Sequence, residues 1–248
     1  EQHHARLERA DAQLVYPQYT GMEERLIQDV RTVSAVEGTK LTILCLLNKT
    51  VVSATLVNSR EGATGEPIVL APGSGNPLQY EATIELKESR RLKLELIDEA
   101  NRKNQKQEQF TINVLSNQPP AVKPLFPAKD LEVSALEELD VRASVSDDFG
   151  LARFGLSYSL AGKPPVDVVL IEQAAAKQKH EIAHQIKLEE LQAEPDQLLS
   201  YYWWAEDHDP SGKIRRTQTD MYFAEVRPFE EIYRQGEQPP GGQQQQQR

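Results

Sequence analysis

The sequence predicts an all-β protein built from two tandem immunoglobulin- or fibronectin-III-like β-sandwich domains. Three features predict this: an internal repeat of one hundred residues, short segments in which apolar and polar residues alternate, and turn residues between those segments. Alternation with a period of two places one face of a strand in a core and the other in water. About seven such strands in roughly 100 residues is the pattern of an immunoglobulin-like sandwich.

The repeat is clearest where VSAVEGTKLTILC (33–45) recurs as VSALEELDVRASV (133–145). Four of the first five residues are identical, and the later apolar positions of the two segments coincide. Without a gap, PIVL at 67–70 falls on DVVL at 167–170. Two copies of one domain of ordinary size explain this register.

Each copy divides into seven expected strands. In the first copy they lie near 30–36, 40–47, 51–57, 67–71, 80–86, 91–98 and 109–115. In the second copy they lie near 130–136, 139–146, 151–159, 166–171, 180–188, 199–206 and 217–227. Turn signals separate them: Glu37-Gly38, APGSGNP (71–77), DDFG (147–150), AGKPP (161–165) and DHDPSG (207–212).

We therefore expect domain 1 at 14–116 and domain 2 at 124–229, joined by a linker at 117–123. The linker region includes paired prolines, which favour a short and stiff connection. Residues 1–13 have helical propensity but little apolar periodicity, which predicts an N-terminal tail or short helix. Residues 230–248 form a low-complexity Gln/Pro/Gly tail that cannot build a core.

Composition narrows the function classes. The net charge of −10 argues against nucleic acid and anionic membrane as partners. No apolar stretch approaches the roughly 20 residues that span a bilayer. The chain begins with Glu1 rather than Met, so we expect it to be a piece of a longer protein. Cys45 is the single cysteine, which excludes an intramolecular disulfide, and its alternating apolar neighbours predict that it is buried.

The segment HEIAH (180–184) matches the zinc metalloprotease signature. That site requires a helix, where His180 and His184 share a face and Glu181 acts as general base. On a strand the two histidines stand about 13 Å apart, too far to share one ion. With a shift of 102 residues, YEATIEL (80–86) of the first copy aligns with IAHQIKL (182–188), which predicts a strand. A zinc metallohydrolase is therefore a distant alternative.

Acidic residues gather in two turns of the second copy. The loops after the second and sixth strands of an immunoglobulin sandwich meet at one pole, so Asp147, Asp148, Asp207 and Asp209 are expected beside the interdomain linker. Carboxylate oxygens at such a hinge are the ligands that calcium prefers. The alternative is a set of ordinary Asp-rich turns, neutralised by Lys123, Lys129 or the basic loop at 101–106.

The aromatic run YYWW (201–204) lies on one expected strand. Alternation directs Tyr201 and Trp203 into the core, and Tyr202 and Trp204 outward. Two outward aromatic rings are a candidate contact surface for carbohydrate or protein. Alternatively, residues 172–179 or the C-terminal arm cover them within the molecule.

Several motifs together resemble a known kind of module. They are VYPQYTG (15–21), VSDDFGLARFGLSY (145–158), LLSYYWWAEDHDPSG (198–212) and AEVRPFEEIYRQGE (224–237). They are similar to immunoglobulin-like modules of large bacterial membrane-anchored proteins, which lie outside the cytoplasmic membrane. The resemblance implies a periplasmic or cell-surface location and no catalytic residues.

The leading hypothesis is thus a non-enzymatic structural or adhesion spacer within a larger membrane-anchored protein. Its expected partners are other proteins or other domains of the same chain, and it requires no cofactor. A ligand-binding module is the alternative, with calcium at the acidic hinge or carbohydrate on the face of Tyr202 and Trp204.

Overall fold

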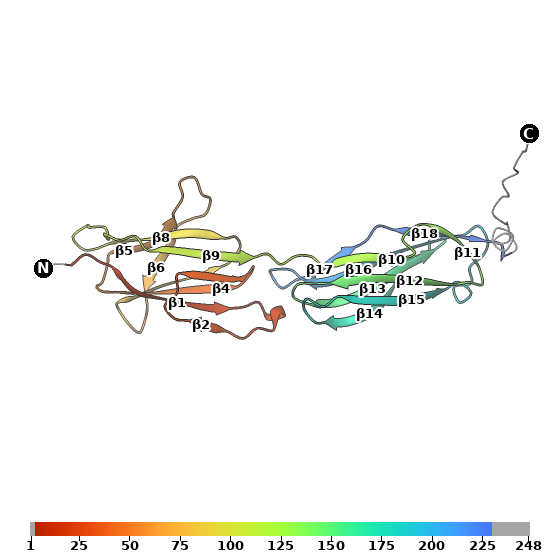
Figure 1. Cartoon of the computed structure of the whole chain (residues 1–248), viewed down its shortest axis with the longest axis horizontal. Coiled ribbons are helices and arrows are strands. Elements are labelled where there is room, and N and C mark those ends of the chain that lie inside the picture. Colours follow the sequence, from red (N-terminus) through yellow and green to blue (C-terminus); the bar gives the residue numbers. More distant parts are fainter. Residues whose placement is uncertain (1–2, 230–248) are drawn as a thin grey trace, which may run out of the picture. The chain divides into compact units, whose positions relative to one another are not determined.

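The computed structural model describes residues 3–229, and the predicted low-complexity tail at 230–248 lies outside them. The described residues form strands joined by turns, with one 3-10 turn, η1, at Gln18–Thr20. They divide into two compact units: residues 3–117 with 210–213 form unit 1, and residues 118–209 with 214–229 form unit 2. Within 3–229, no helix has the length and apolar character needed to cross a membrane. The chain is an all-β protein of two immunoglobulin- or fibronectin-III-like sandwiches (Figure 1).

Unit 1 contains nine strands. They are β1 (Leu7–Val15), β2 (Arg25–Ile27), β3 (Thr32–Val36), β4 (Lys40–Leu47), β5 (Ser53–Asn58), β6 (Ile68–Pro72), β7 (Gln79–Glu85), β8 (Arg90–Ile97) and β9 (Gln109–Leu115). They pair in the order β2-β1-β4-β7-β6-β5-β8-β9-β3. The start of β6 pairs with β5 and its end pairs with β7, so this strand joins the two faces of the sandwich.

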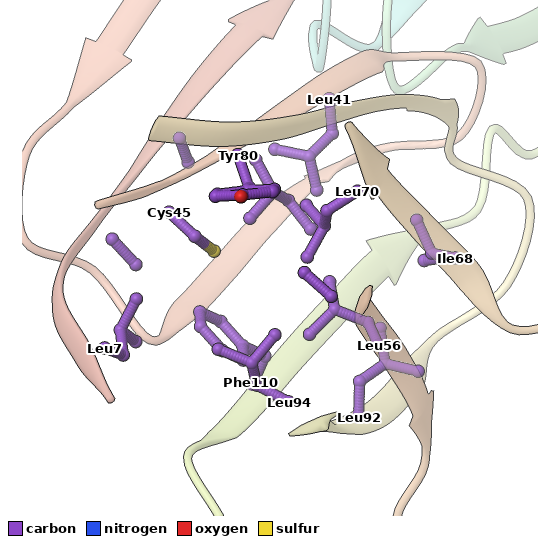
Figure 2. Close-up of a cluster of buried hydrophobic side chains, with 14 of the residues drawn as sticks. Leu7, Leu41, Cys45, Leu56, Ile68, Leu70, Tyr80, Leu92, Leu94 and Phe110 are labelled. Atoms are coloured by element: carbon purple, nitrogen blue, oxygen red, sulfur yellow. The ribbon is translucent and has the colours of Figure 1, made fainter. Parts of the chain in front are cut away.

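The core of unit 1 follows from alternation. In β4, Leu41, Ile43 and Cys45 are buried, and the residues between them are partly exposed. Facing strands supply further leucines and Phe110 (Figure 2). Tyr80 fits this core because its hydroxyl accepts a hydrogen bond from the Val51 amide and donates one to the Val51 carbonyl. The buried polar end of the tyrosine is thereby satisfied.

Unit 2 contains the other nine strands. They are β10 (Ala121–Phe126), β11 (Leu131–Ser134), β12 (Glu138–Ser146), β13 (Leu151–Leu160), β14 (Val166–Ala174), β15 (His180–Lys187), β16 (Leu198–His208), β17 (Ile214–Gln218) and β18 (Tyr222–Arg227). One sheet has the order β10-β12-β15 and the other the order β11-β18-β16-β13-β14, with β17 paired to β16. Between the sheets, the rings of Phe154 and Trp203 stack with centroids 5.7 Å apart.

The pairings of the two units correspond at an offset of one hundred. Cys45 of β4 faces Tyr80 of β7, and Val145 of β12 faces His180 of β15. Both Cys45 and Val145 are buried, as expected. The sequence alignment of YEATIEL (80–86) with IAHQIKL (182–188) assumed a shift of 102 residues, whereas the pairing gives a shift of 100, so the expected shift was wrong by two. A slip of two leaves every side chain on its own face, so the prediction of a strand held.

The predicted helix or tail at residues 1–13 is wrong. Leu7–Val15 is strand β1, which pairs with β4 along its length and buries Ala10, Ala12 and Leu14. The predicted linker at 117–123 was also too long, because Ala121 already begins β10 and pairs with β12. Helical propensity is a weak preference that tertiary pairing overrides.

The chain enters and leaves each unit at opposite poles. In unit 2, Ala121 of β10 pairs with Ser146 at one pole, and β18 runs to the other pole, where Glu225 faces Leu198. In unit 1, β1 enters beside Leu47, and β9 leaves next to the end of β3. In each unit a parallel ladder holds the last strand: β3 with β9 and β11 with β18.

Burial of Cys45 gives the first prediction. Burial raises the pKa of its thiol to about 12, and the thiolate is the species that reacts with thiol reagents. The native protein is therefore expected not to react at neutral pH until denaturant unfolds unit 1. A Val69→Cys variant, at a side chain that is 72% exposed, should react at once and serves as the control. Rapid modification of the natural chain without denaturant would show that β4 does not pack as described.

Candidate functional site

The HEIAH segment lies on strand β15, at the edge of the three-stranded sheet. His180 faces Val145 and His184 faces Val141 on β12. Desolvation lowers the pKa of His184, which favours its neutral form. The helix that a zinc hydrolase site of this signature requires is not formed, so that alternative is wrong.

The acidic pole of unit 2 brings Asp147 and Asp207 together. Asp147 follows β12 and is 6% exposed, whereas Asp207 lies near the end of β16 and is 1% exposed. Arg215 of β17 faces Asp207 in the ladder and binds both of its oxygens, with Nε at 3.0 Å and Nη2 at 2.6 Å. At this pole, two buried carboxyl groups therefore lie near the Arg215 guanidinium, which binds Asp207 through two donors.

Asp147 accommodates this excess of negative charge by keeping its proton. The pKa of Asp147 is raised to about 7, chiefly by desolvation and also by the charges of Asp207 and Asp148, against one opposing hydrogen bond from the Phe149 amide. Asp147 Oδ1 is buried and has no partner that could donate a hydrogen bond to it. A proton on Asp147 that is shared with Asp207 accounts for this, since a protonated carboxyl group is itself a donor.

The other two predicted aspartates, Asp148 and Asp209, make different interactions. Asp148 Oδ2 accepts a hydrogen bond from the Gln118 amide at 2.8 Å. Asp209 follows β16, and its charge raises the pKa of Arg215. Among residues 3–229, no three His, Cys, Asp or Glu side chains are placed to hold one metal ion. The geometry favours neutralisation of the pole by Arg215 rather than by Lys123 or Lys129, and the calcium site stays a prediction.

The corresponding pole of unit 1 is compensated by cations. Asp98, which follows β8, accepts hydrogen bonds from the backbone amides of Arg102 and Ala100, and it pairs with the side chains of Arg102 and Lys49. The Arg102 amide is the main cause that lowers the pKa of Asp98 to about 2. The carboxylate in this pole is therefore ionised at all ordinary pH values.

The predicted aromatic surface is not exposed as expected. Trp204 does point away from the core that contains Trp203, yet it is fully buried, and Tyr202 is half-buried. An open two-ring platform at Tyr202 and Trp204 is therefore wrong. The alternative of cover within the molecule is right, but the arginines that cover Trp204 come from β13 and β17 and not from the two expected segments, residues 172–179 or the C-terminal arm.

Two arginines cover Trp204. The guanidinium carbon of Arg216 lies 4.1 Å from the ring centroid, and that of Arg153 lies 5.5 Å from it. Both arginines donate to Glu206 Oε1, at 3.1 Å and 2.6 Å respectively. The indole also rests on Gly155 of β13, where a Cβ atom would lie 2.5 Å from Trp204 Cζ2 and 2.2 Å from the Val168 carbonyl oxygen. The ring is thus enclosed between the sheet and two cations.

Comparison with known proteins found similar solved structures but no family for this chain. No family model and no curated protein matches it. Solved structures similar to it include the fibronectin(III)-like modules of Clostridium thermocellum CbhA, with 18% identity, 80% of this chain and 90% of that chain covered, and a TM-score of 0.26. A 1.5-MDa bacterial ice-binding adhesin matches with 13% identity, coverage of 80% and 61%, and a TM-score of 0.41. The DIP-gamma IG1+IG2 structure matches with 11% identity, coverage of 79% and 92%, and a TM-score of 0.31.

The buried carboxyl pair predicts an unusual pH dependence. The pKa of Asp147 is higher in the folded than in the unfolded state, so the folded state binds the extra proton. Stability is therefore lost as pH rises from about 4 to about 7, and the loss levels off above that range. We expect Asp147→Asn to be more stable than the natural chain by about 2–4 kcal/mol at pH 8 and nearly equal to it at pH 4.

Chemical denaturation across this pH range measures the difference. Glu138→Gln, which removes an exposed carboxylate from the same strand, is the matched control and should follow the natural chain. Parallel curves for the natural chain and Asp147→Asn would show that Asp147 is ionised in the folded state.

The close contact between Gly155 and Trp204 predicts a specific intolerance. Gly155→Ala places a methyl group within van der Waals overlap of backbone and indole, so we expect a loss of about 1–3 kcal/mol in the free energy of unfolding. The control is Ala152→Gly, at a half-buried position of the same strand. It replaces alanine by glycine, the reverse of the change made at Gly155. The Trp fluorescence of the folded state should shift with Gly155→Ala alone. Unchanged stability would mean that Trp204 does not lie on this glycine.

Proposed function

We propose that this chain is a non-enzymatic structural spacer made of two consecutive sandwich domains. It bears force and sets the distance between other parts of a larger protein. The observation that supports the proposal is the path of the chain, which enters each unit at one pole and leaves at the other. A domain with this path lengthens a protein by its own long dimension. Domains whose ends lie together do not.

The terminal ladders suit a module under tension. β11 and β18 run parallel with the register Leu131–Ala224 to Ser134–Arg227, and β3 and β9 run parallel from Thr32–Thr111 to Val36–Leu115. Tension on the C-terminal end of a unit pulls its last strand lengthwise along this parallel ladder. All hydrogen bonds of the ladder are then strained together, which resists separation more than breaking them one at a time.

The wider setting of the spacer is also part of the proposal. The four motifs quoted above resemble modules of large membrane-anchored bacterial proteins, which supports a periplasmic or cell-surface position and anchoring through segments outside 1–248. Contacts with other proteins, or with other domains of the same chain, are expected on exposed strand surfaces. Val69 of β6 and Val166 of β14 are two such exposed apolar positions.

Single-molecule force spectroscopy on the whole chain tests the proposal. Each unit holds about 110 residues, so stretching should give two discrete unfolding events that each release roughly 350 Å. Val133→Pro removes a backbone donor from the β11–β18 ladder, and it should lower the unfolding force of unit 2 alone. Unit 1 in the same molecule is the internal control. Extension of the natural chain without discrete force peaks, or an unchanged unit 2 peak in the variant, would refute a force-bearing role.

A further inference from the structure

Strand β15 forms an open edge of the three-stranded sheet in unit 2. Within residues 3–229 it pairs with β12 alone, in eight consecutive pairs without a register shift. Just past the strand, the Leu188 amide donates to the Glu137 carbonyl on the β12 side. Since the direction of backbone hydrogen bonding alternates along a strand, the amides and carbonyls of the odd-numbered residues in 181–187 face the open edge. Such a row of backbone groups can pair with another strand.

The other edge strands of the described chain have features that discourage such pairing. β2, β3, β11 and β17 are short, with three to five residues each. β10 contains Pro124 and a register shift, and β14 has a register shift against β13. Proteins commonly protect exposed edges by these means. β15 has eight residues, no proline, no glycine and no shift, so it lacks all of these protections.

The side chains of β15 complement a second copy of the same strand. When two copies run antiparallel about a two-fold axis at His184, Glu181 lies opposite the partner's Lys187 on the outer face, and the symmetry repeats this pair. On the inner face, Ile182 lies opposite the partner's Ile186. Opposed pairs of opposite charge and of apolar residues both stabilise a sheet. The edge amides and carbonyls then meet their counterparts, which gives about eight new backbone hydrogen bonds.

Charge also selects this register over its neighbours. Just outside the strand, Lys179 lies opposite the partner's Glu189 in the same arrangement. A slip of two residues in one direction places Lys187 opposite the partner's Lys179, and a slip in the other direction places Glu181 opposite the partner's Glu189. Like charges directly opposite each other are destabilising. Within one chain, Lys187 pairs with Glu190 at 3.7 Å, but this ion pair is exposed and therefore weak.

We propose that β15 is a self-association edge, through which two copies of this chain join their three-stranded sheets into one continuous antiparallel sheet. The two His184 rings meet at its centre, and desolvation lowers the pKa of His184, which favours neutral rings that do not repel each other. In unit 1 the equivalent strand, β7, already pairs with β6 along part of the corresponding edge. One strand per copy is a small interface, so we expect a dissociation constant of about 10 μM to 1 mM.

Sedimentation equilibrium of the whole chain up to about 1 mM tests the proposal. The average mass should rise towards that of a dimer. Glu181→Lys, at an exposed position, places like charges opposite each other in both symmetric pairs and should weaken association by about tenfold. The double variant Glu181→Lys/Lys187→Glu restores opposite charges and should restore the affinity. Glu85→Lys, the same charge change at an exposed position of β7, is the matched control and should associate as the natural chain does.

A cysteine at the two-fold axis tests the register. The two copies of residue 184 lie directly opposite each other with Cα atoms about 4.5 Å apart, which is within the range of a disulfide. His184→Cys should therefore give a disulfide-linked dimer on oxidation with diamide. Ile182→Cys, also half-buried on the same face, should not, because its two copies are offset by four residues, or about 13 Å. The natural Cys45 is buried and does not interfere.

Three results would overturn the proposal: a constant monomer mass up to about 1 mM, an association that Glu181→Lys leaves unchanged, or equal cross-linking of both cysteine variants. A constant monomer mass would leave the edge to a strand of a different protein. None of these results bears on the force-bearing role, which is measured on single molecules and rests on the terminal ladders.

Discussion

Each sandwich depends on one constraint: the period-two alternation of its strands must bury one continuous apolar face against the facing sheet. Leu41, Ile43 and Cys45 of β4 meet this constraint in unit 1, and Val141, Ala143 and Val145 of β12 meet it in unit 2. Burial of these faces is the dominant favourable term in folding. It also fixes which residues remain outside, and therefore where any surface chemistry is placed.

Most of the strands could be predicted because alternation is local and visible in the sequence. β4 and β9 have the predicted bounds of 40–47 and 109–115. Strand β1 was missed because its many charged residues resemble a helix, and its identity depends on a partner about thirty residues away. Its equivalent, β10, lies 112 rather than 100 residues further along, judged by the pairs Ala10–Cys45 and Val122–Val145. The repeat with a constant offset therefore did not reveal either strand.

The candidate sites were predictable only in part, for a related reason. The chain order of a sandwich places Asp147 and Asp207 at one pole, and the structure brings them together. Their counter-ion, Arg215, lies on β17 (Ile214–Gln218), whereas the predicted strand began only at residue 217, so the cation was assigned elsewhere. The alternation of apolar and polar residues correctly predicted that the Trp204 side chain points away from the core. It could not give the reach of long arginine side chains from neighbouring strands.

The charged groups of the two units therefore contribute differently. In unit 2, Glu206 and Asp207 are buried but each is bound by arginine, so the outer aromatic ring and the acidic pole are closed by interactions within the unit. Buried pairs of this kind contribute little net stability, and breaking one is costly, because an isolated charge then remains in the interior. In unit 1, Asp98 is compensated in the same way, whereas Arg90 is held by neutral groups alone.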